Sequence, residues 1–515
     1  MMSPVAVAGS AGADDLDGLP IVRLHFVRHN IFDLDDPKTS SWPFRWANAL
    51  HVVSRESMIR SMLVLEEGMP YSRRDAEESA RILRSLGFLN PVFITAERVE
   101  GGVEVTVVTH DQWTLELRAD GDLSGDRSGW SLAFLEQNLL GHGKRVKLEY
   151  SSDDERDTWA GEYFDPNILG TRWQARLQYE DSTDGSRSRV HLQRPFFSLA
   201  TRRAWGGEWL DESRVEHLYA AGETTVDGRR SSDVLGAWGG LRLPGDGGLV
   251  RRLILGWQTR DDRFTDWQWT DDGTAYPTPD DRRISGPRLG FELVSDRFEV
   301  LEGFRGFAAQ EDIALGPNLK LGVIASLPAF GGDRQRWLLD AAMEHTFHRD
   351  GWLVLASAWA SGRLEAAGLE NLRLGGQLAA SQLGARVWQL RLLVEDTHDL
   401  DLDRQLTLGA DAGLRGWDPD FFDGTGRALL NVQRRHLVKR DLWNVFSIGV
   451  AVFGDAGITW DARVGDSTAG VRLAAGLGLI ADMTSIGLYN LLRLDVGFPD
   501  DGSGPTITVT SSALF

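Results

Sequence analysis

The chain ends on the stretch Pro505-Thr-Ile-Thr-Val-Thr-Ser-Ser-Ala-Leu-Phe515, and this stretch decides the fold. Successive side chains of a β-strand point to opposite faces. One face then carries mainly apolar side chains and the other carries hydroxyl groups, as in a strand between lipid and a polar lumen. The apolar positions are Ile507, Val509, Ala513 and Phe515, and the hydroxyl positions are Thr506, Thr508, Thr510 and Ser512. The alternative is the last edge strand of a soluble β-sandwich.

Length and hydropathy narrow the class of protein. The chain has 515 residues, which is enough for a large barrel and an accessory domain. Hydrophobic residues make up 42%, yet the mean hydropathy is −0.25. No apolar run reaches the ~18 residues that a spanning helix needs, so a helical membrane protein is excluded. A barrel is not excluded, because alternation lowers the hydropathy of its strands.

Charge and residue usage exclude further classes. The net charge is −20 and the basic residues are dispersed, which argues against a nucleic-acid partner. The 57 glycines and 19 tryptophans suit tight turns and the aromatic belts of a barrel, although large core residues would also explain the tryptophans. Cysteine is absent from the sequence, which excludes thiol catalysis and cysteine-based metal sites.

The first 110 residues divide into two parts. We interpret residues 1–20 as a disordered segment and a candidate signal remnant, because small residues are present without a basic start or a full apolar core. Residues 21–111 predict a small α/β domain in the order β-α-α-β-β. The helices are expected at residues 55–65 and 72–86, and a strand hairpin turns at Gly101-Gly102. An unrelated small α/β fold is the alternative to the resemblance described below.

Residues 112–515 contain little helical periodicity and many alternating segments. In one of them Trp173, Ala175, Leu177 and Tyr179 oppose charged or amide side chains. The lengths fit transmembrane strands of ~9–11 residues. At ~24 residues for each strand with its loop, the segment predicts a mainly β protein with a barrel of about 16 strands. Asn138-Leu-Leu-Gly recurs as Asn167-Ile-Leu-Gly, which we interpret as repeated turn geometry.

Two motifs lie in the last quarter of the chain. The first is Gly413-Leu414-Arg415-Gly416-Trp417, in a polar stretch near residues 399–425, where glycines allow a tight turn and present a single arginine. The second consists of Phe453, Asp455 and Gly457 on a strand whose alternation points Asp455 into the lumen. An arginine and a carboxylate form bidentate pairs, so Arg415 and Asp455 are candidate partners.

These motifs resemble those of the BamA/TamA-like superfamily, whose members combine POTRA domains with an outer-membrane barrel. The segment EEGMPYSRRDAEESARILRSLGF at residues 66–88 resembles part of a POTRA domain, and the terminal Phe515 resembles the family's assembly signal. The resemblance implies a sixteen-stranded barrel in the bacterial outer membrane with the POTRA-like domain in the periplasm. It also implies that the loop folds inward, that Arg415 binds Asp455, and that Ile507, Val509, Ala513 and Phe515 direct assembly. A single POTRA-like domain departs from the family's general assembly factor.

No enzyme is expected. The 11 histidines of the sequence show no H-E-x-x-H spacing, and neither a G-x-S-x-G elbow nor a phosphate loop is present. The acidic residues at 151–157 could suggest calcium, but a solvated loop fits their spacing better. We therefore expect no catalytic residue, cofactor or metal.

Two functions of different classes remain. In the first, the protein inserts or translocates polypeptides by strand addition at a lateral seam between residues 113–123 and 506–515. Its partners would be unfolded outer-membrane or secreted polypeptides, periplasmic chaperones or accessory proteins, and outer-membrane lipid. Insertion and two-partner secretion are not separated. In the second, the chain is a passive barrel or surface antigen with a periplasmic anchoring module.

Overall fold

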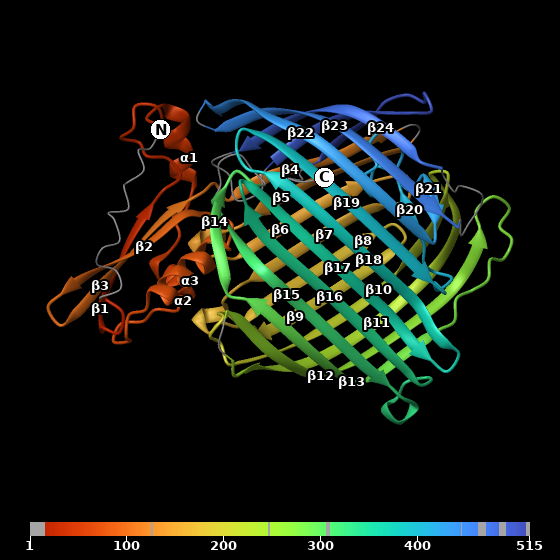
Figure 1. Ribbon diagram of the computed structural model, residues 1–515, viewed down its shortest axis with the longest axis horizontal. Coiled ribbons are helices and arrows are strands. Elements are labelled where there is room, and N and C mark those ends of the chain that lie inside the picture. The colour runs from red at the N-terminus through yellow and green to blue at the C-terminus, as the bar shows by residue number, and fades with distance from the viewer. Residues whose placement is uncertain are drawn as a thin grey trace.

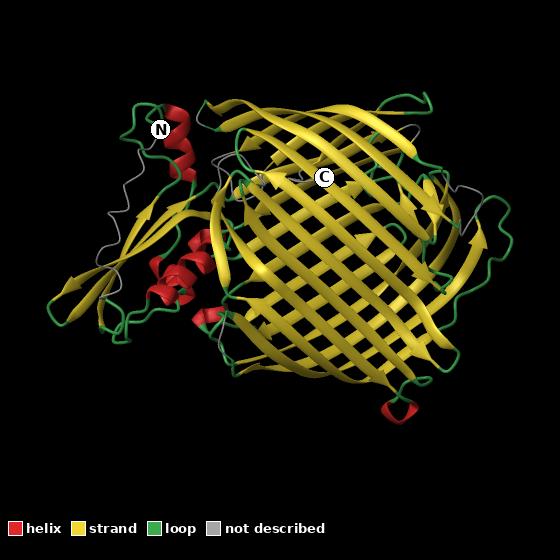
Figure 2. Cartoon of the chain, viewed as in Figure 1, coloured by secondary structure: helices red, strands yellow, loops and turns green. Residues whose placement is uncertain are grey.

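The computed structural model describes residues 16–124, 127–245, 248–304, 310–443, 445–461, 470–483 and 491–510. A small α/β domain lies against one end of a large β-barrel (Figure 1). Helices gather in the α/β domain, and strands form the barrel wall (Figure 2). Among the described residues, no helix combines the length and the apolar character that a membrane crossing requires.

The α/β domain has a three-stranded sheet in the order β1-β3-β2, with β1 parallel to β3. Its core contains Ile59, Leu83 and Val105, all with no measurable exposure. Helix α1 between β1 and α2 was not predicted, and none of its residues is buried. The elements are β1 (Ile21–His29), α1 (Trp42–Leu50), α2 (Glu56–Met62), α3 (Arg73–Arg84), β2 (Leu89–Val99) and β3 (Gly102–Asp111).

Local chemistry explains the limits of helix α3. The Ser72 side chain accepts a hydrogen bond from the Asp75 amide, which satisfies one unpaired donor of the first turn. Gly87 then takes a φ of +89°, the left-handed conformation that glycine adopts without steric cost after a helix. The predicted order of elements around this helix therefore holds, apart from the added α1.

The barrel closes on itself through antiparallel pairing of β26 with β4. Its strands are β4 (Leu115–Ser124), β5 (Arg127–Glu136), β6 (Arg145–Ser152), β7 (Asp157–Asp165), β8 (Gln174–Ser182), β9 (Gly185–Arg194), β10 (Arg203–Ala220), β11 (Glu223–Leu243), β12 (Leu249–Trp269), β13 (Arg282–Ser295), β14 (Arg297–Glu302), β15 (Gln310–Ser326), β16 (Arg336–Arg349), β17 (Trp352–Glu365), β18 (Gly368–Gln382), β19 (Arg386–His398), β22 (Gly426–Leu442), β23 (Phe446–Trp460), β24 (Arg472–Met483), β25 (Leu491–Pro499) and β26 (Thr506–Thr510).

The barrel has 20 strands around its wall, and the prediction of about 16 was wrong. Strands β13 and β14 both pair with β15, at different heights, so they count as one interrupted strand. The error came from loop length. Only residues 221–222 join β10 to β11, and only residues 350–351 join β16 to β17. Turns this short leave more of the chain for strands than the predicted spacing allowed.

The outer and inner faces of the wall differ in polarity. Large apolar side chains are exposed on the outside, with Leu117 at 73%, Leu235 at 60% and Val452 at 58%. Polar side chains such as Gln433 and Arg435 are buried on the inside. An apolar outer band around a polar interior is the pattern of a transmembrane β-barrel, as the predicted place in the outer membrane requires.

The α/β domain is fixed to the barrel by two copies of one turn. The Asn138 side chain donates to Ser54 Oγ at 2.9 Å, and the Asn167 side chain donates to Ser61 Oγ at 2.7 Å. In both turns the second residue after the asparagine has a left-handed backbone, with φ of 53° at Leu140 and 50° at Leu169. The sequence echo is thus a repeated docking turn for the segment around α2.

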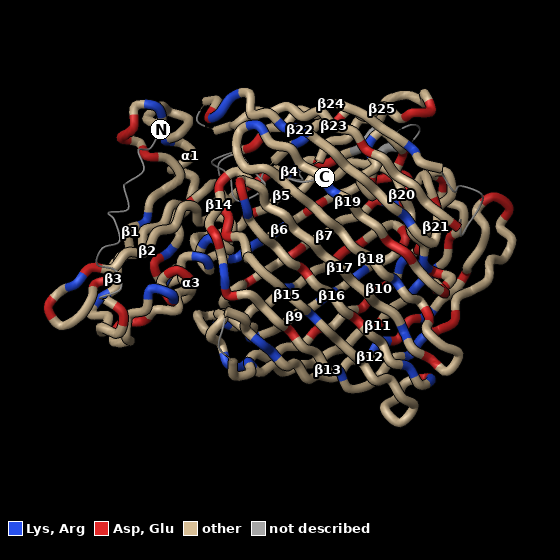
Figure 3. The backbone as a smooth tube through the Cα atoms, in the orientation of Figure 1, with Lys and Arg blue, Asp and Glu red and all other residues tan. Residues whose placement is uncertain are grey.

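A second contact joins α3 to β14 and β15. Arg84 forms a bidentate pair with Asp312, at 2.7 and 2.6 Å. Arg81 lies 4.1 Å from the centre of the Phe298 ring, and burial lowers the pKa of Arg81 while Glu78 acts in the opposite direction. Acidic and basic residues gather along this contact (Figure 3).

Candidate functional site

The segment between β19 and β22 folds into the barrel. Its strands β20 (Leu406–Leu408) and β21 (Phe422–Gly424) pair with each other and form a small hairpin. Leu414 and Trp417 at its tip are 0% and 3% exposed, and they pack with Leu429 and Ala474 of the wall. Apolar packing thus holds the tip of the loop against the inner wall.

Arg415 binds Asp455 inside the barrel. Its Nε donates to Asp455 Oδ2 at 2.8 Å and its Nη2 donates to Oδ1 at 2.7 Å. Nη1 donates to Gln433 Oε1 at 3.1 Å, and the guanidinium carbon lies 3.7 Å from the centre of the Phe453 ring. Arg415 is 7% exposed and Asp455 is 4% exposed. The two sequence motifs therefore meet in one buried, charge-assisted contact.

Neighbouring wall residues extend this contact. Asn431 donates to Asp455 Oδ1 and to the carbonyl oxygen of Gly413, both at 2.8 Å. Arg493 donates to Gln433 Oε1 at 2.9 Å. We call Arg415, Asp455, Gln433 and Asn431 the tip anchor. Sequence reasoning missed Gln433, Asn431 and Arg493, although inward polar positions on β22 and β25 are the signal that would have selected them.

Glycines let the tip approach the wall. Gly416 has a φ of +97°, and a Cβ built there would lie 3.1 Å from Ala474 Cβ. A Cβ on the wall residue Gly497 would lie 2.6 Å from the Gly416 nitrogen. A Cβ on Gly457 would lie 2.8 Å from Leu408 and 3.1 Å from Leu414. Backbone contact this close requires residues without a side chain.

A second set of ion pairs holds the stem of the loop. Arg363 donates to both carboxylate oxygens of Asp401, at 2.6 and 2.7 Å. Arg282 donates to both oxygens of Asp403, at 3.1 and 2.9 Å. We call these four residues the stem anchor. The sequence showed only a polar stretch here, because the partners come from the separate strands β13 and β17.

The described part of the seam between β26 and β4 is short. Three register pairs join the strands within the described residues, namely Ile507 with Leu123, Thr508 with Asp122 and Val509 with Gly121. By contrast, ten pairs join β4 to β5. Ala513 and Phe515 of the predicted assembly signal lie outside the described residues.

A cavity of about 860 Å³ lies between the seam and the tip of the loop. Gly121 and Thr508 line it from the seam, Asp495 lines it from β25, which pairs with β26, and Arg415 lines it from the tip of the loop. The cavity thus connects the inner side of the seam with the tip anchor.

The described residues contain no group of three or more histidine and carboxylate side chains placed to hold a metal. In the acidic loop at residues 151–157, Asp153 Oδ1 accepts the backbone amides of Glu155 and Arg156 at 2.8 and 2.9 Å. Asp153 therefore stabilises a turn.

Comparison with known proteins gives similarity of structure only. No family model matches the sequence, and no curated protein matches it. A structure of BamA from Haemophilus ducreyi lacking POTRA domains 1–3 is 14% identical, with a TM-score of 0.39, covering 95% of this chain and 84% of that one. CdiB from Acinetobacter baumannii is 10% identical, with a TM-score of 0.45, covering 96% and 74%. CdiB from Escherichia coli is 13% identical, with a TM-score of 0.47, covering 95% and 76%.

Proposed function

We propose that this outer-membrane barrel inserts or translocates polypeptides by strand addition at the seam between β26 and β4. The observation that carries the proposal is the seam of three register pairs, which borders the cavity inside the barrel. A client that reaches the cavity would meet the wall contact with the fewest register pairs among the described strands.

The energetics favour opening at this place. A backbone hydrogen bond contributes about 1 kcal/mol net in water, and an unpaired group costs more in lipid. Separating the three pairs of the described seam therefore costs less than separating the ten pairs between β4 and β5. The freed edges of β4 and β26 would offer unpaired amides and carbonyls to an incoming strand.

The loop would act as a fixed inner support during this opening. The tip anchor joins the loop to β22 and β23, and the stem anchor joins it to β13 and β17. Neither anchor includes a residue of β4 or β26. The loop can therefore stay in place while the seam separates, and its role is structural and not catalytic.

A disulfide across the seam tests the proposal. The chain has no cysteine, so Gly121→Cys with Val509→Cys creates a single oxidisable pair at facing positions. Ala341→Cys with Ala360→Cys on β16 and β17 is the matched control, because these small residues also face each other. We expect oxidation to abolish activity in the seam variant, reduction to restore it, and the control to stay active.

The activity is measured as the effect that depletion of the protein has on the levels of outer-membrane barrels and secreted proteins. A broad loss of outer-membrane barrels would support insertion, and loss of one secreted partner would support two-partner secretion. Unchanged levels of both would contradict the proposal and support a passive barrel. Full activity of the oxidised seam variant would exclude opening at this seam.

A further inference from the structure

Helix α1 exposes a stripe of large apolar side chains. Trp42, Trp46 and Leu50 follow each other at intervals of four residues, so they share one face of the helix. They are 75%, 66% and 64% exposed. Single exposed apolar residues are common on protein surfaces, but a stripe of two tryptophans and a leucine on a short helix indicates a binding surface.

The opposite face of α1 is fixed to the α/β domain. The Phe44 ring packs edge-on against Phe32, with ring centres 4.7 Å apart. The Asn48 side chain accepts the Phe32 amide at 3.1 Å and donates to the Phe32 carbonyl at 2.7 Å. The helix is therefore held in one rotational setting, and the stripe points away from the domain.

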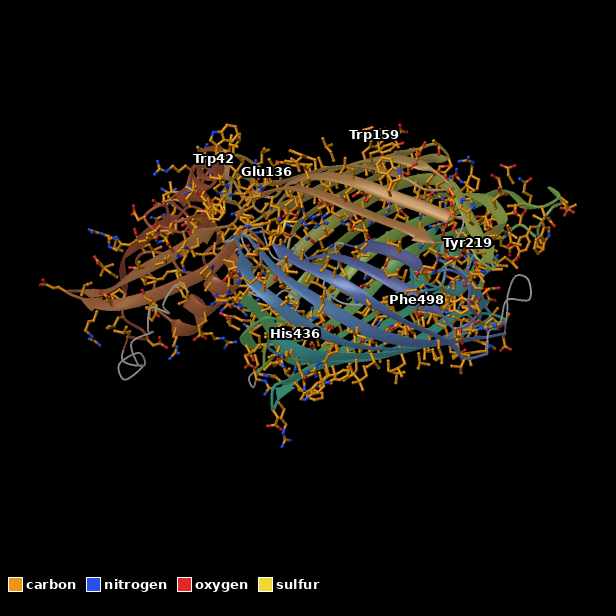
Figure 4. The ribbon with its side chains drawn as sticks, turned by 90° about the horizontal axis from the view of Figure 1, so that it is seen from above. Trp42, Glu136, Trp159, Tyr219, His436 and Phe498 are labelled. Atoms are coloured by element: carbon orange, nitrogen blue, oxygen red, sulfur yellow. The ribbon has the colours of Figure 1, made fainter. Side chains whose placement is uncertain are left out.

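The chain after α1 holds the helix at the rim of the barrel. The His51 ring nitrogen lies 2.9 Å from Asp111 Oδ2, at the end of the strand that leads into β4. The Arg55 amide donates to the Gly141 carbonyl, in the turn between β5 and β6, at 2.9 Å. Figure 4 places Trp42 beside Glu136, the last residue of β5, on the side from which Trp159 also projects.

The stripe continues the apolar outer surface of the barrel. On the strands nearest to α1, Leu117 is 73% exposed and Leu132 is 51% exposed. In the docking turns, Leu140 is 60% exposed and Leu169 is 91% exposed. Helix α1 runs crosswise to the long axis of the barrel (Figure 1). Because a barrel crosses the bilayer along its axis, such a helix lies along the membrane surface.

We propose that α1 is a membrane-surface anchor that places Trp42, Trp46 and Leu50 at the boundary between headgroups and acyl chains. The leaflet is the one on the side of the α/β domain. Tryptophan favours this boundary because its ring is apolar and its N–H is polar. Arg45 is exposed on the flank of the stripe, where a long basic side chain reaches the headgroups. The anchor holds the α/β domain against lipid beside β4, the first strand of the seam.

Quenching in proteoliposomes tests this proposal, which rests on the barrel being in the membrane and not on its transport role. Trp46→Cys, labelled with an environment-sensitive fluorophore, reports on the stripe, because the chain has no other cysteine. Leu117→Cys on the outer wall is the lipid-facing control, and Glu100→Cys in the turn between β2 and β3 is the water-facing control. We expect brominated lipid to quench position 46 within about twofold of position 117, and iodide to quench only position 100.

Each other outcome overturns the anchor. Quenching of position 46 by iodide alone would show that the stripe faces water. Protection from both quenchers would show that protein covers it, such as residues 1–15 or a second copy of the chain. Absence of lipid quenching at position 117 would instead place the barrel outside the bilayer, and the proposed function would fail with it. Trp42→Cys and Leu50→Cys repeat the measurement if Trp46→Cys does not fold.

Discussion

The tip anchor and the seam both border the central cavity, but they differ in how they are held. At the tip anchor, Arg415 and Asp455 form two hydrogen bonds with each other, and Asn431 and Gln433 complete the network in buried positions. At the seam, three register pairs join β26 to β4 among the described residues. Buried polar groups are costly when unpaired and specific when paired. Among the described residues, buried charged groups therefore hold the loop, and three register pairs hold the seam.

This difference fits separate roles for the loop and the seam in the proposed function. A loop held at its tip and at its stem keeps a defined shape inside the lumen. A short seam can separate without disturbing either anchor, because no anchor residue lies on β4 or β26.

Breaking the tip anchor should have the largest effect. We expect Arg415→Ala or Asp455→Ala to destabilise the barrel by about 3–5 kcal/mol, because the remaining charge stays buried without its partner. The double variant should lose little more than the worse single variant. Heat-modifiable gel mobility and urea unfolding measure the loss. Arg263→Ala is the control, because its pair with Asp261 is exposed and solvent screens the attraction. Additive losses at 415 and 455 would contradict the observed contact.

Breaking the stem anchor should cost less. Asp401→Asn removes the charge that Arg363 and Arg282 share, and the expected loss is about 2–3 kcal/mol, as for a hydrogen bond to a charged group. Protease cleavage of the loop in the folded barrel should also accelerate. Asp399→Asn is the matched control, because Asp399 is 66% exposed and pairs with an exposed histidine. Equal effects of the two variants would show that the stem anchor contributes nothing specific.

Steric pressure on the tip should have a smaller effect still. Gly497→Ala places a Cβ 2.6 Å from the Gly416 nitrogen, so the tip must shift, at a cost of about 1–2 kcal/mol. Gly454→Ala is the control, because its nearest neighbour would be 3.9 Å away. Crosslinking between the tip and β25 should weaken in Gly497→Ala alone. Unchanged crosslinking would show that the approach is looser than the structure has it.

The sequence predicted the features that depend on local periodicity. Alternation placed Asp455 toward the lumen, and helical spacing at residues 55–65 and 72–86 gave the order of elements in the α/β domain. The strand count failed because a two-residue turn leaves almost no mark in a pattern of alternating residues. The stem anchor was missed because Arg282 and Asp403 are 121 positions apart and meet only after the barrel closes.

Helix α1 was not predicted from the sequence, for a different reason. Its signals are local, since Ser41 precedes it, Pro43 occupies its first turn, and Trp42, Trp46 and Leu50 repeat at helical spacing. An apolar stripe usually predicts a helix face that packs into a core. For this helix that prediction would have been wrong, because Trp42, Trp46 and Leu50 are exposed. Only the docked position of the helix shows that the stripe faces outward.

A proline in β26 tests how firmly the seam is held compared with the rest of the wall. Thr508→Pro removes one backbone donor from β26, which makes five register pairs with β25 and three with β4 among the described residues. We expect a smaller loss of stability than in the middle of the wall, because fewer register pairs hold β26 on its two sides. Val432→Pro is the matched control in the middle of the wall, where β22 pairs with β19 on one side and β23 on the other. That variant should be destabilised by about 3 kcal/mol or more. If both prolines destabilise the barrel equally in urea unfolding, then β26 is held as firmly as the rest of the wall. If Thr508→Pro alone folds and also accelerates crosslinking of a client strand to β4, the short pairing limits the opening of the barrel.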